Sequence, residues 1–258
     1  MHTLQAFVVL DLTMSPLSPL TISVVVPVVD EAARVGACVA ALRAGQEAVN
    51  ADPLVRVGEI VVVDGGSSDA TVEVARAGGA RVVASAVRGR AAQMNAGAAA
   101  TRGDVLYFVH GDAVVPPAYA RDIARALAPG DAVGGYRVRF DRRRSPLLRV
   151  NEWMTRFAWP VCRGGDQTLF VPRALFDALG GYDERRVIME EYDFLDRARR
   201  HVRYRVLDGV AVVSARKYVT NTWWQVQRAN AAAYRAYRRG AAPEAIERGY
   251  RSDLNAYT

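Results

Sequence analysis

Acidic side chains follow apolar runs in the first half of the chain. Such runs of Val, Ile and Leu predict strands that are buried on both faces. Where parallel strands end at one edge of a sheet, their carboxylates gather there and repel each other. A Mg²⁺ or Mn²⁺ ion that bridges phosphate oxygens to a carboxylate would relieve this repulsion. The first run, residues 22–26, is stopped by Pro27 and followed by Asp30 and Glu31. The second, residues 59–63, is followed by Asp64, and the fourth, residues 105–109, by Asp112 with His110 before it.

A basic turn, Arg88–Arg90, follows the third run, the short segment at residues 81–83. Guanidinium groups bind phosphate in a planar, bidentate arrangement, so this turn and the carboxylates together suit a diphosphate and its cation. Each signal also has a simpler interpretation. The segment Asp64–Gly66 can be an ordinary turn, Asp112 can begin a helix before Pro116, and the arginines can be surface charge. Their joint placement at successive strand ends favours a binding site.

The elements that must position these side chains alternate along the first half of the sequence. Strands and helices follow one another over residues 22–109, which is typical of a parallel sheet covered on both faces. Residues 136–140 alternate polar and apolar, like an antiparallel strand. We therefore expect an α/β catalytic domain over residues 21–215, with a mainly parallel central sheet, and a C-terminal helical segment, 216–258, packed on it.

Composition narrows the class of protein. The chain has 258 residues, of which 51% are hydrophobic, enough for one large domain with a full core. Its two cysteines form neither a disulfide framework nor a four-ligand zinc site, and a reducing, cytoplasmic location fits best. The net charge of +7 favours an anionic partner: a nucleotide, nucleic acid or acidic lipid. No apolar run reaches the roughly 18 residues of a membrane span. Residues 1–20 lack the basic start of a signal peptide, so we expect an extension outside the fold, with Met14 as an alternative start.

Five segments carry a specific resemblance. The series SVVVPVVDEA, EIVVVDGGSSDAT, GRAAQMNAGAAATRGDVLYFVHGDAVVP, GGDQTLFVPRALFDALGGYDE and IMEEYDFLDRARR resembles family 2 glycosyltransferases with the A-type, Rossmann-like nucleotide-sugar fold. The order and spacing match over roughly residues 21–215. Within that family the chain is most similar to a bacterial subgroup of short, stand-alone enzymes that have His in place of the first Asp of the D-x-D element.

The resemblance implies an activity, a cofactor and partners. The activity is transfer of a sugar from a nucleoside diphosphate sugar to an acceptor hydroxyl that is not identified, with a divalent cation, Mn²⁺ or Mg²⁺; nucleic acid is not an expected partner. The resemblance also implies a role for each matching position. These roles are Pro27 and Glu31 at the base and ribose, Asp64 at the base, Arg90 and Asn95 near the ribose or diphosphate, Asp112 as the metal ligand, Asp166 and Gln167 at the sugar and acceptor, and Glu191 as catalytic base.

The pair Glu190 and Glu191 has a chemical rationale. Transfer with inversion needs one carboxylate to deprotonate the acceptor hydroxyl, while the metal stabilises the leaving diphosphate. Neighbouring residues point about 100° apart around a helix, so Glu190 and Glu191 cannot face the acceptor equally. Glu190 is the nearest competitor if the helix begins one residue later or the loop turns differently. The simpler interpretation is that Glu190, Glu191 and Asp193 merely open a helix, where acidic side chains favour the dipole.

His110 departs from the family pattern, in which an aspartate contacts ribose or metal. Imidazole can ligate Mn²⁺ but is a poor ligand for Mg²⁺, so we expect metal dependence to be weaker or biased towards manganese. The alternative, which we favour, is that His110 only hydrogen-bonds the ribose.

The C-terminal segment begins with Arg216–Tyr218, which would lie near the site if the chain returns over it. We place Trp223 at the sugar or acceptor. The helix that follows carries arginines and aromatics, which suit either a lipid surface or packing on the catalytic domain. We favour packing, because one face carries Ala231–Ala233 and no run of Leu or Ile. Peripheral contact with the inner face of the membrane stays open.

Rival functions lack their expected motifs. A sugar-phosphate nucleotidyltransferase needs a glycine-rich, basic loop after the first strand, where this chain has PVVDE. A dehydrogenase needs G-x-G-x-x-G at that turn. A non-catalytic nucleotide-sugar-binding module would have no use for Glu191.

Overall fold

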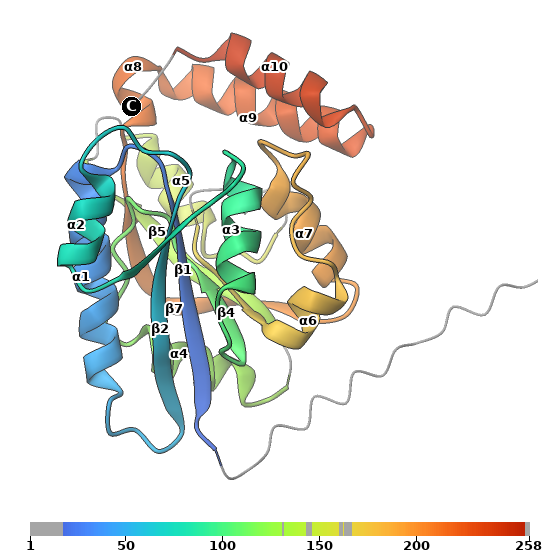
Figure 1. Cartoon of the computed structure of the whole chain (residues 1–258). Coiled ribbons are helices and arrows are strands. Elements are labelled where there is room, and N and C mark those ends of the chain that lie inside the picture. Colours follow the sequence, from blue (N-terminus) through green and yellow to red (C-terminus); the bar gives the residue numbers. More distant parts are fainter. Residues whose placement is uncertain (1–17, 131, 143–145, 160–161, 163–166, 256–258) are drawn as a thin grey trace, which may run out of the picture.

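The computed structural model describes residues 18–130, 132–142, 146–159, 162 and 167–255. Within these residues, seven strands form one sheet in the order β3-β2-β1-β4-β6-β5-β7 (Figure 1). The strands are β1 Leu20–Val28, β2 Val55–Asp64, β3 Arg81–Ala84, β4 Val105–Phe108, β5 Ala132–Phe140, β6 Leu169–Pro172 and β7 Arg203–Val213. Among them β6 alone runs against its neighbours, β4 and β5. The other strands therefore end at one edge, which we call the carboxyl edge.

Helices cover both faces of this sheet. They are α1 Ala32–Ala48, α2 Thr71–Ala77, α3 Arg90–Ala99, α4 Tyr119–Leu127, α5 Leu148–Met154, α6 Arg173–Ala178, α7 Glu190–Ala198, α8 Lys217–Thr220, α9 Trp223–Arg238 and α10 Pro243–Asp253. Buried side chains of α1, α2, α4 and α5 pack on one face, and those of α3, α6 and α7 pack on the other. The mainly parallel α/β fold predicted from the valine runs is confirmed.

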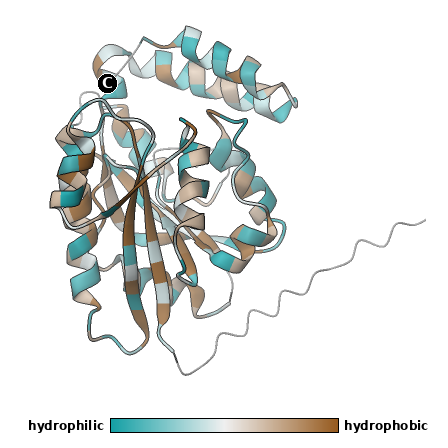
Figure 2. Ribbon diagram, viewed as in Figure 1, coloured by the Kyte–Doolittle hydropathy of each residue, from teal (hydrophilic) through white to brown (hydrophobic). Residues whose placement is uncertain are grey.

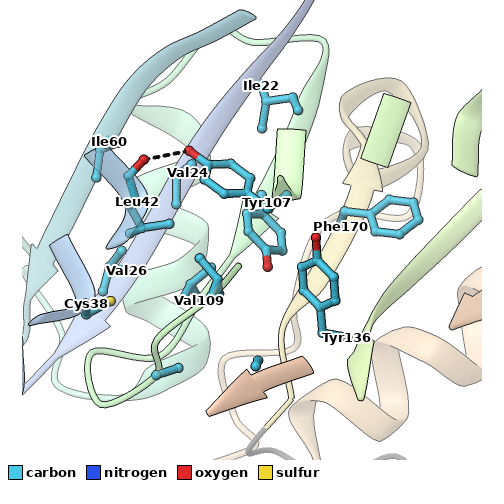
Figure 3. Packing of buried hydrophobic residues seen from close by; sticks show 14 of the residues in the cluster. Ile22, Val24, Val26, Cys38, Leu42, Ile60, Tyr107, Val109, Tyr136 and Phe170 are labelled. Atoms are coloured by element: carbon cyan, nitrogen blue, oxygen red, sulfur yellow. Dashed lines mark hydrogen bonds between the residues drawn. The ribbon is translucent and has the colours of Figure 1, made fainter. Parts of the chain in front are cut away.

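The valine run of β1 shows why the strands are buried on both faces. Val24 and Val26 belong to one core, while Val25 belongs to the other, and all three are fully buried. Figure 2 shows the same pattern as hydrophobic colour along the central strands. In the first core, Tyr107 of β4 lies next to the β1 side chains, and Phe170 of β6 and Tyr136 of β5 continue the packing across the sheet (Figure 3).

Two strands differ from their sequence-based description. We expected Pro27 to stop the first strand, yet β1 continues to Val28. Its ladder with β4 ends at Val25, so the missing N–H of Pro27 faces a side where no strand partner remains. We expected residues 136–140 to be antiparallel, but β5 pairs in parallel with β7 along most of its length. The alternation there reflects exposure of one face at Arg139 and not the strand direction.

Helices α9 and α10 lie across the carboxyl edge (Figure 1). At the start of α9, Trp223 Nε1 donates to Asn151 Oδ1 of α5 at 3.1 Å. Near its end, the Tyr237 hydroxyl donates to Asp196 Oδ2 of α7 at 2.9 Å. The backbone N–H of Asn255 donates to Asn221 Oδ1 at 2.8 Å and so ties the end of α10 back to the start of α9. Among the described residues, no helix is long and apolar enough to span a membrane.

Candidate active site

The turn after β2 uses the carboxylate of Asp64 within itself. Backbone N–H groups of Gly66 and Ser67 each donate to this carboxylate at 3.1 Å, and the Ser67 hydroxyl donates to it as well. Gly66 has a φ of 90°, a conformation that glycine adopts at little cost. Asp64 therefore holds the turn, and a carboxylate with about four acceptor positions keeps room for one more donor.

The turns after β1 and β2 form one hydrogen-bonded unit. Asp30 has a φ of 54°, and its carboxylate accepts from the Ser68 backbone N–H at 2.7 Å. The carboxylate of Asp69 accepts from the Ala32 N–H at 3.1 Å and from the Thr71 hydroxyl. Hydrogen bonds from Ser68 lower the pKa of Asp30, and the bond from the Thr71 hydroxyl lowers the pKa of Asp69. These two turns make a rigid floor at the carboxyl edge.

Gln93 fastens this floor from α3, a role that sequence reasoning missed. Its side chain is buried, and Nε2 donates to the carbonyls of Val28 and Val63, both at 2.8 Å. A glutamine within an alanine-rich helix was the available signal. The amide thus links the carboxyl ends of β1 and β2 to each other and to α3.

Glu190 and Glu191, at the start of α7, each contact a nitrogen-bearing side chain from another element. Arg90 Nε donates to Glu190 Oε1, and His110 Nε2 lies 3.2 Å from Glu191 Oε1. Met189, the residue before α7, has a φ of 67°, so the chain turns sharply where it enters the helix. Glu190 is 1% exposed. Burial raises its pKa, while the Arg90 charge opposes that rise.

Arg216 lies between two carboxylates of different strand ends. Its Nη2 donates to Glu31 Oε1 and lies 3.6 Å from Asp112 Oδ2. Burial raises the pKa of Glu31, while the hydrogen bond and positive charge of Arg216 act to lower it. The segment after β7 thus returns over the site, as its sequence position allowed.

A pocket of about 230 Å³ connects these groups with the C-terminal helices. One wall carries charged side chains from the carboxyl edge and the start of α7. The opposite wall comes from α8, α9 and α10. The residues are Arg90, Asp112, Glu190, Glu191 and Arg216 on the first wall, and Lys217, Tyr218, Asn230 and Tyr250 on the second; Ile188, Met189, Tyr192 and Ser214 complete the lining.

Other sequence-predicted residues lie outside the lining of this pocket. Asn95 holds the chain before α7, since its Nδ2 donates to the Tyr182 carbonyl at 2.9 Å. Pro27 is buried in β1, and Trp223 is hydrogen-bonded to Asn151 of α5. Gln167 Nε2 donates to the Cys162 carbonyl at 2.8 Å. Asp166 lies outside the described residues, and the binding roles given to all these positions stay predictions.

Asn230 and Tyr250 are pocket residues that sequence reasoning missed. The Tyr250 hydroxyl donates to Asn230 Oδ1 at 3.1 Å, so α9 and α10 present one joined surface. Lys217, the single lysine in the chain, has its ammonium nitrogen 6.0 Å from the centre of the Tyr250 ring. The position of Arg216–Tyr218 directly after the last predicted strand was the sequence signal that pointed to this wall.

Comparison with known proteins decides the family. The profile of glycosyl transferase family 2 matches residues 23–178, more than half of the chain. The chain belongs to glycosyltransferase family 2. This confirms the family predicted from the five segments. In this family 2 glycosyltransferase, Glu190, Glu191 and Arg216 lie beyond the matched residues. No curated protein matches the chain.

Solved structures share the fold of this glycosyltransferase. Glucosyl-3-phosphoglycerate synthase from Mycobacterium tuberculosis, in complex with Mn²⁺, UDP and glucosyl-3-phosphoglycerate, is 22% identical with a TM-score of 0.57; the match covers 86% of this chain and 80% of that chain. Mannosyltransferase PcManGT from Pyrobaculum calidifontis, in complex with GDP-Man and Mn²⁺, is 21% identical with a TM-score of 0.60, covering 90% and 69%. The likeness confirms the A-type glycosyltransferase fold.

Proposed function

We propose that the protein transfers a sugar from a nucleoside diphosphate sugar to an acceptor hydroxyl with inversion. Glu191 is the base, and Asp112 holds a Mn²⁺ or Mg²⁺ ion. The observation that carries this proposal is that Asp112, Arg90 and Glu191 line one and the same pocket. A diphosphate needs positive charge, an acceptor hydroxyl needs a base, and both are provided within one cavity.

The floor made by the turns after β1 and β2 suits the nucleoside. Asp64 retains one acceptor position for a base N–H, and Pro27 and Glu31 lie at the same edge. Arg90, at the start of α3, supplies a guanidinium for the diphosphate. We assign the remaining predicted binding roles, those of Asn95, Gln167 and Trp223, to positions around this floor and the acceptor, and they await direct tests.

The residues at the carboxyl edge fit a hard divalent cation. Mg²⁺ and Mn²⁺ prefer oxygen ligands, and they are often bound by one or two carboxylates together with substrate phosphates. Asp112 offers such a carboxylate, and Oε2 of the neighbouring Glu31 is buried without a hydrogen-bond partner among the described residues. Among those residues, no group of three or more His, Cys, Asp or Glu side chains is arranged for a metal. A bound cation would offset the charge of the leaving diphosphate.

Glu191 is the better placed of the two candidate bases. The buried Glu190 is held by Arg90, and its task in this arrangement is to fix that guanidinium at the start of α3. Glu191 lies beside the ring of His110. An imidazole N–H at this distance can hold the carboxylate in the orientation in which it accepts the acceptor's proton.

The acceptor side is assigned to the C-terminal helices. We place the catalytic unit at residues 21–215, and residues 216–258 complete its pocket through Lys217, Asn230 and Tyr250. The polar groups of these three side chains suit a hydrophilic acceptor. The loop after β1 has no glycine-rich phosphate cradle, which disfavours a sugar-phosphate nucleotidyltransferase.

Binding of UDP, GDP and dTDP, each with and without Mn²⁺, tests the donor site. Calorimetry should show that Mn²⁺ strengthens binding of the preferred nucleotide. Asp112→Asn should weaken that metal-assisted binding more than tenfold, because one charge-assisted contact is lost. Asp177→Asn, at an exposed position on α6, is the matched control. Metal-independent binding that is equal in wild type and Asp112→Asn would contradict the role of Asp112.

A further inference from the structure

Arg216 is the one contact between the carboxylates of Glu31 and Asp112 in the described residues. The three side chains are partly or fully shielded, with exposed fractions of 24% for Arg216, 8% for Glu31 and 17% for Asp112. The two carboxylates come from the ends of β1 and β4, which are neighbouring strands. Arg34 lies 3.9 Å from Glu31 Oε2, but the guanidinium of Arg216 is the one that contacts both carboxylates in the described residues.

The contacts of Arg216 with Glu31 and with Asp112 differ in kind. Nη2 is hydrogen-bonded to Glu31 Oε1, whereas its 3.6 Å separation from Asp112 Oδ2 is longer than a hydrogen bond between such atoms. Arg216 can therefore keep Glu31 while it releases Asp112. Because Arg216 and Asp112 line the same pocket as Arg90, a released guanidinium still faces the space assigned to the diphosphate.

A divalent cation that binds Asp112 competes with this guanidinium for the same carboxylate. Two positive charges a few ångströms apart repel strongly in a partly buried site. A diphosphate removes the conflict, since it supplies negative oxygens to both the cation and the guanidinium. Arg216 therefore sets the order of affinities: the cation alone binds poorly, and the cation with a diphosphate binds well.

We propose that Arg216 is a built-in counter-cation that occupies Asp112 while the donor is absent and turns to the diphosphate when the metal ion takes Asp112. This inference rests on the proposed function in one respect, that Asp112 is the metal ligand. It goes beyond that function because it makes metal binding depend on the nucleotide and assigns that dependence to one residue after β7.

The test is a crossed effect of Arg216→Gln on two ligands measured separately. Mn²⁺ alone, titrated by the loss of the free-ion electron paramagnetic resonance signal, should bind the variant about tenfold more tightly than wild type. UDP and GDP without metal should bind it about tenfold more weakly, since a guanidinium–phosphate contact is lost. Arg125→Gln, whose arginine is exposed on α4, controls for the change in net charge.

Two further variants locate the cause. Arg216→Lys keeps the positive charge and should retain the weak Mn²⁺ binding of wild type, even if Arg216→Gln does not fold. Arg216→Gln combined with Asp112→Asn should lose the gain in Mn²⁺ affinity. Weaker or unchanged Mn²⁺ binding by Arg216→Gln would overturn the proposal, as would tight Mn²⁺ binding by Arg216→Lys.

The proposed function can fail separately. If Asp112→Asn alone leaves metal-assisted nucleotide binding intact, Asp112 is not the metal ligand, whatever Arg216 does. If Asp112→Asn abolishes it while Arg216→Gln shows no crossed effect, the metal site stands and the counter-cation is wrong.

Discussion

Acidic side chains near the carboxyl edge form two groups, which we call the turn side and the pocket side, and the two groups are held in opposite ways. In the turns after β1 and β2, hydrogen bonds from Ser68 and Thr71 lower the pKa values of Asp30 and Asp69. In and beside the pocket, burial raises the pKa values of Glu31 and Glu190. The first pair is stabilised as carboxylates by its own turns. The second pair depends on arginines for its charge, and arginines can also bind phosphate.

The partners differ in their distance along the chain. Asp64 is hydrogen-bonded to Ser67, three residues away, and Asp30 to Ser68, 38 residues away, while Glu190 and Arg90 are 100 residues apart and Glu31 and Arg216 are 185 apart. Short-range bonds stabilise a turn whether or not a ligand is present. Long-range ion pairs across a pocket can exchange partners when a charged ligand arrives. Substitutions on the turn side should therefore affect stability first, and those on the pocket side should affect binding and turnover.

The largest effect is expected on the pocket side, at Glu191. Glu191→Gln should lower turnover of the donor and acceptor roughly 10²–10⁴-fold, because a general base is lost, while donor affinity changes little. Initial rates and calorimetric donor binding measure the two quantities separately. Asp193→Asn is the control, since Asp193 pairs with Arg197 on the same helix at 2.9 Å and lies outside the pocket lining.

Glu190→Gln distinguishes the two neighbouring carboxylates. It removes the charge that fixes Arg90, so donor affinity should fall along with rate. If Glu191→Gln keeps more than about a tenth of wild-type turnover while Glu190→Gln is inactive, the base is Glu190. If both remain active, the two acids only start α7 and the proposed mechanism is wrong.

A smaller effect, on stability, is expected from Asp64→Ala on the turn side. Three donors lose their acceptor, which should lower the free energy of unfolding by about 1–3 kcal/mol. Urea unfolding of the two proteins measures this difference, and Asp177→Ala gives the effect of removing an exposed aspartate. An unchanged unfolding free energy, with nucleotide binding lost, would show that Asp64 serves the ligand alone and would break the contrast between the two sides.

The same contrast explains what could be predicted from sequence. The sheet and its carboxyl edge were predictable because their signals are local. These signals are the valine runs, which suit strands buried on both faces, and turn residues such as Asp64 and Gly66. Pairs such as His110 with Glu191 need the relative placement of β4 and α7, which no local pattern encodes. Tyr250 reaches the pocket only because α10 folds back along α9. The prediction that Pro27 ends the first strand was wrong, because a proline interrupts a strand only where its missing N–H is needed. That depends on where the pairing with β4 ends.

The smallest effect concerns pH and isolates one turn acid, Asp69. Its pKa is lowered below the ordinary value of 3.8, mainly by the Thr71 hydroxyl. A carboxyl group whose folded pKa is depressed stabilises the protein above its unfolded pKa, and this contribution disappears as pH falls through the folded pKa. Asp69→Asn should therefore be less stable than wild type at neutral pH, and the two unfolding temperatures should converge below pH 3.8. Glu31 and Glu190 have the opposite sign, since their raised pKa values favour the folded state as pH falls. Their contribution is present in both proteins and cancels in the difference, so a difference that stays constant or widens on acidification would show that the turn does not hold Asp69 as a carboxylate.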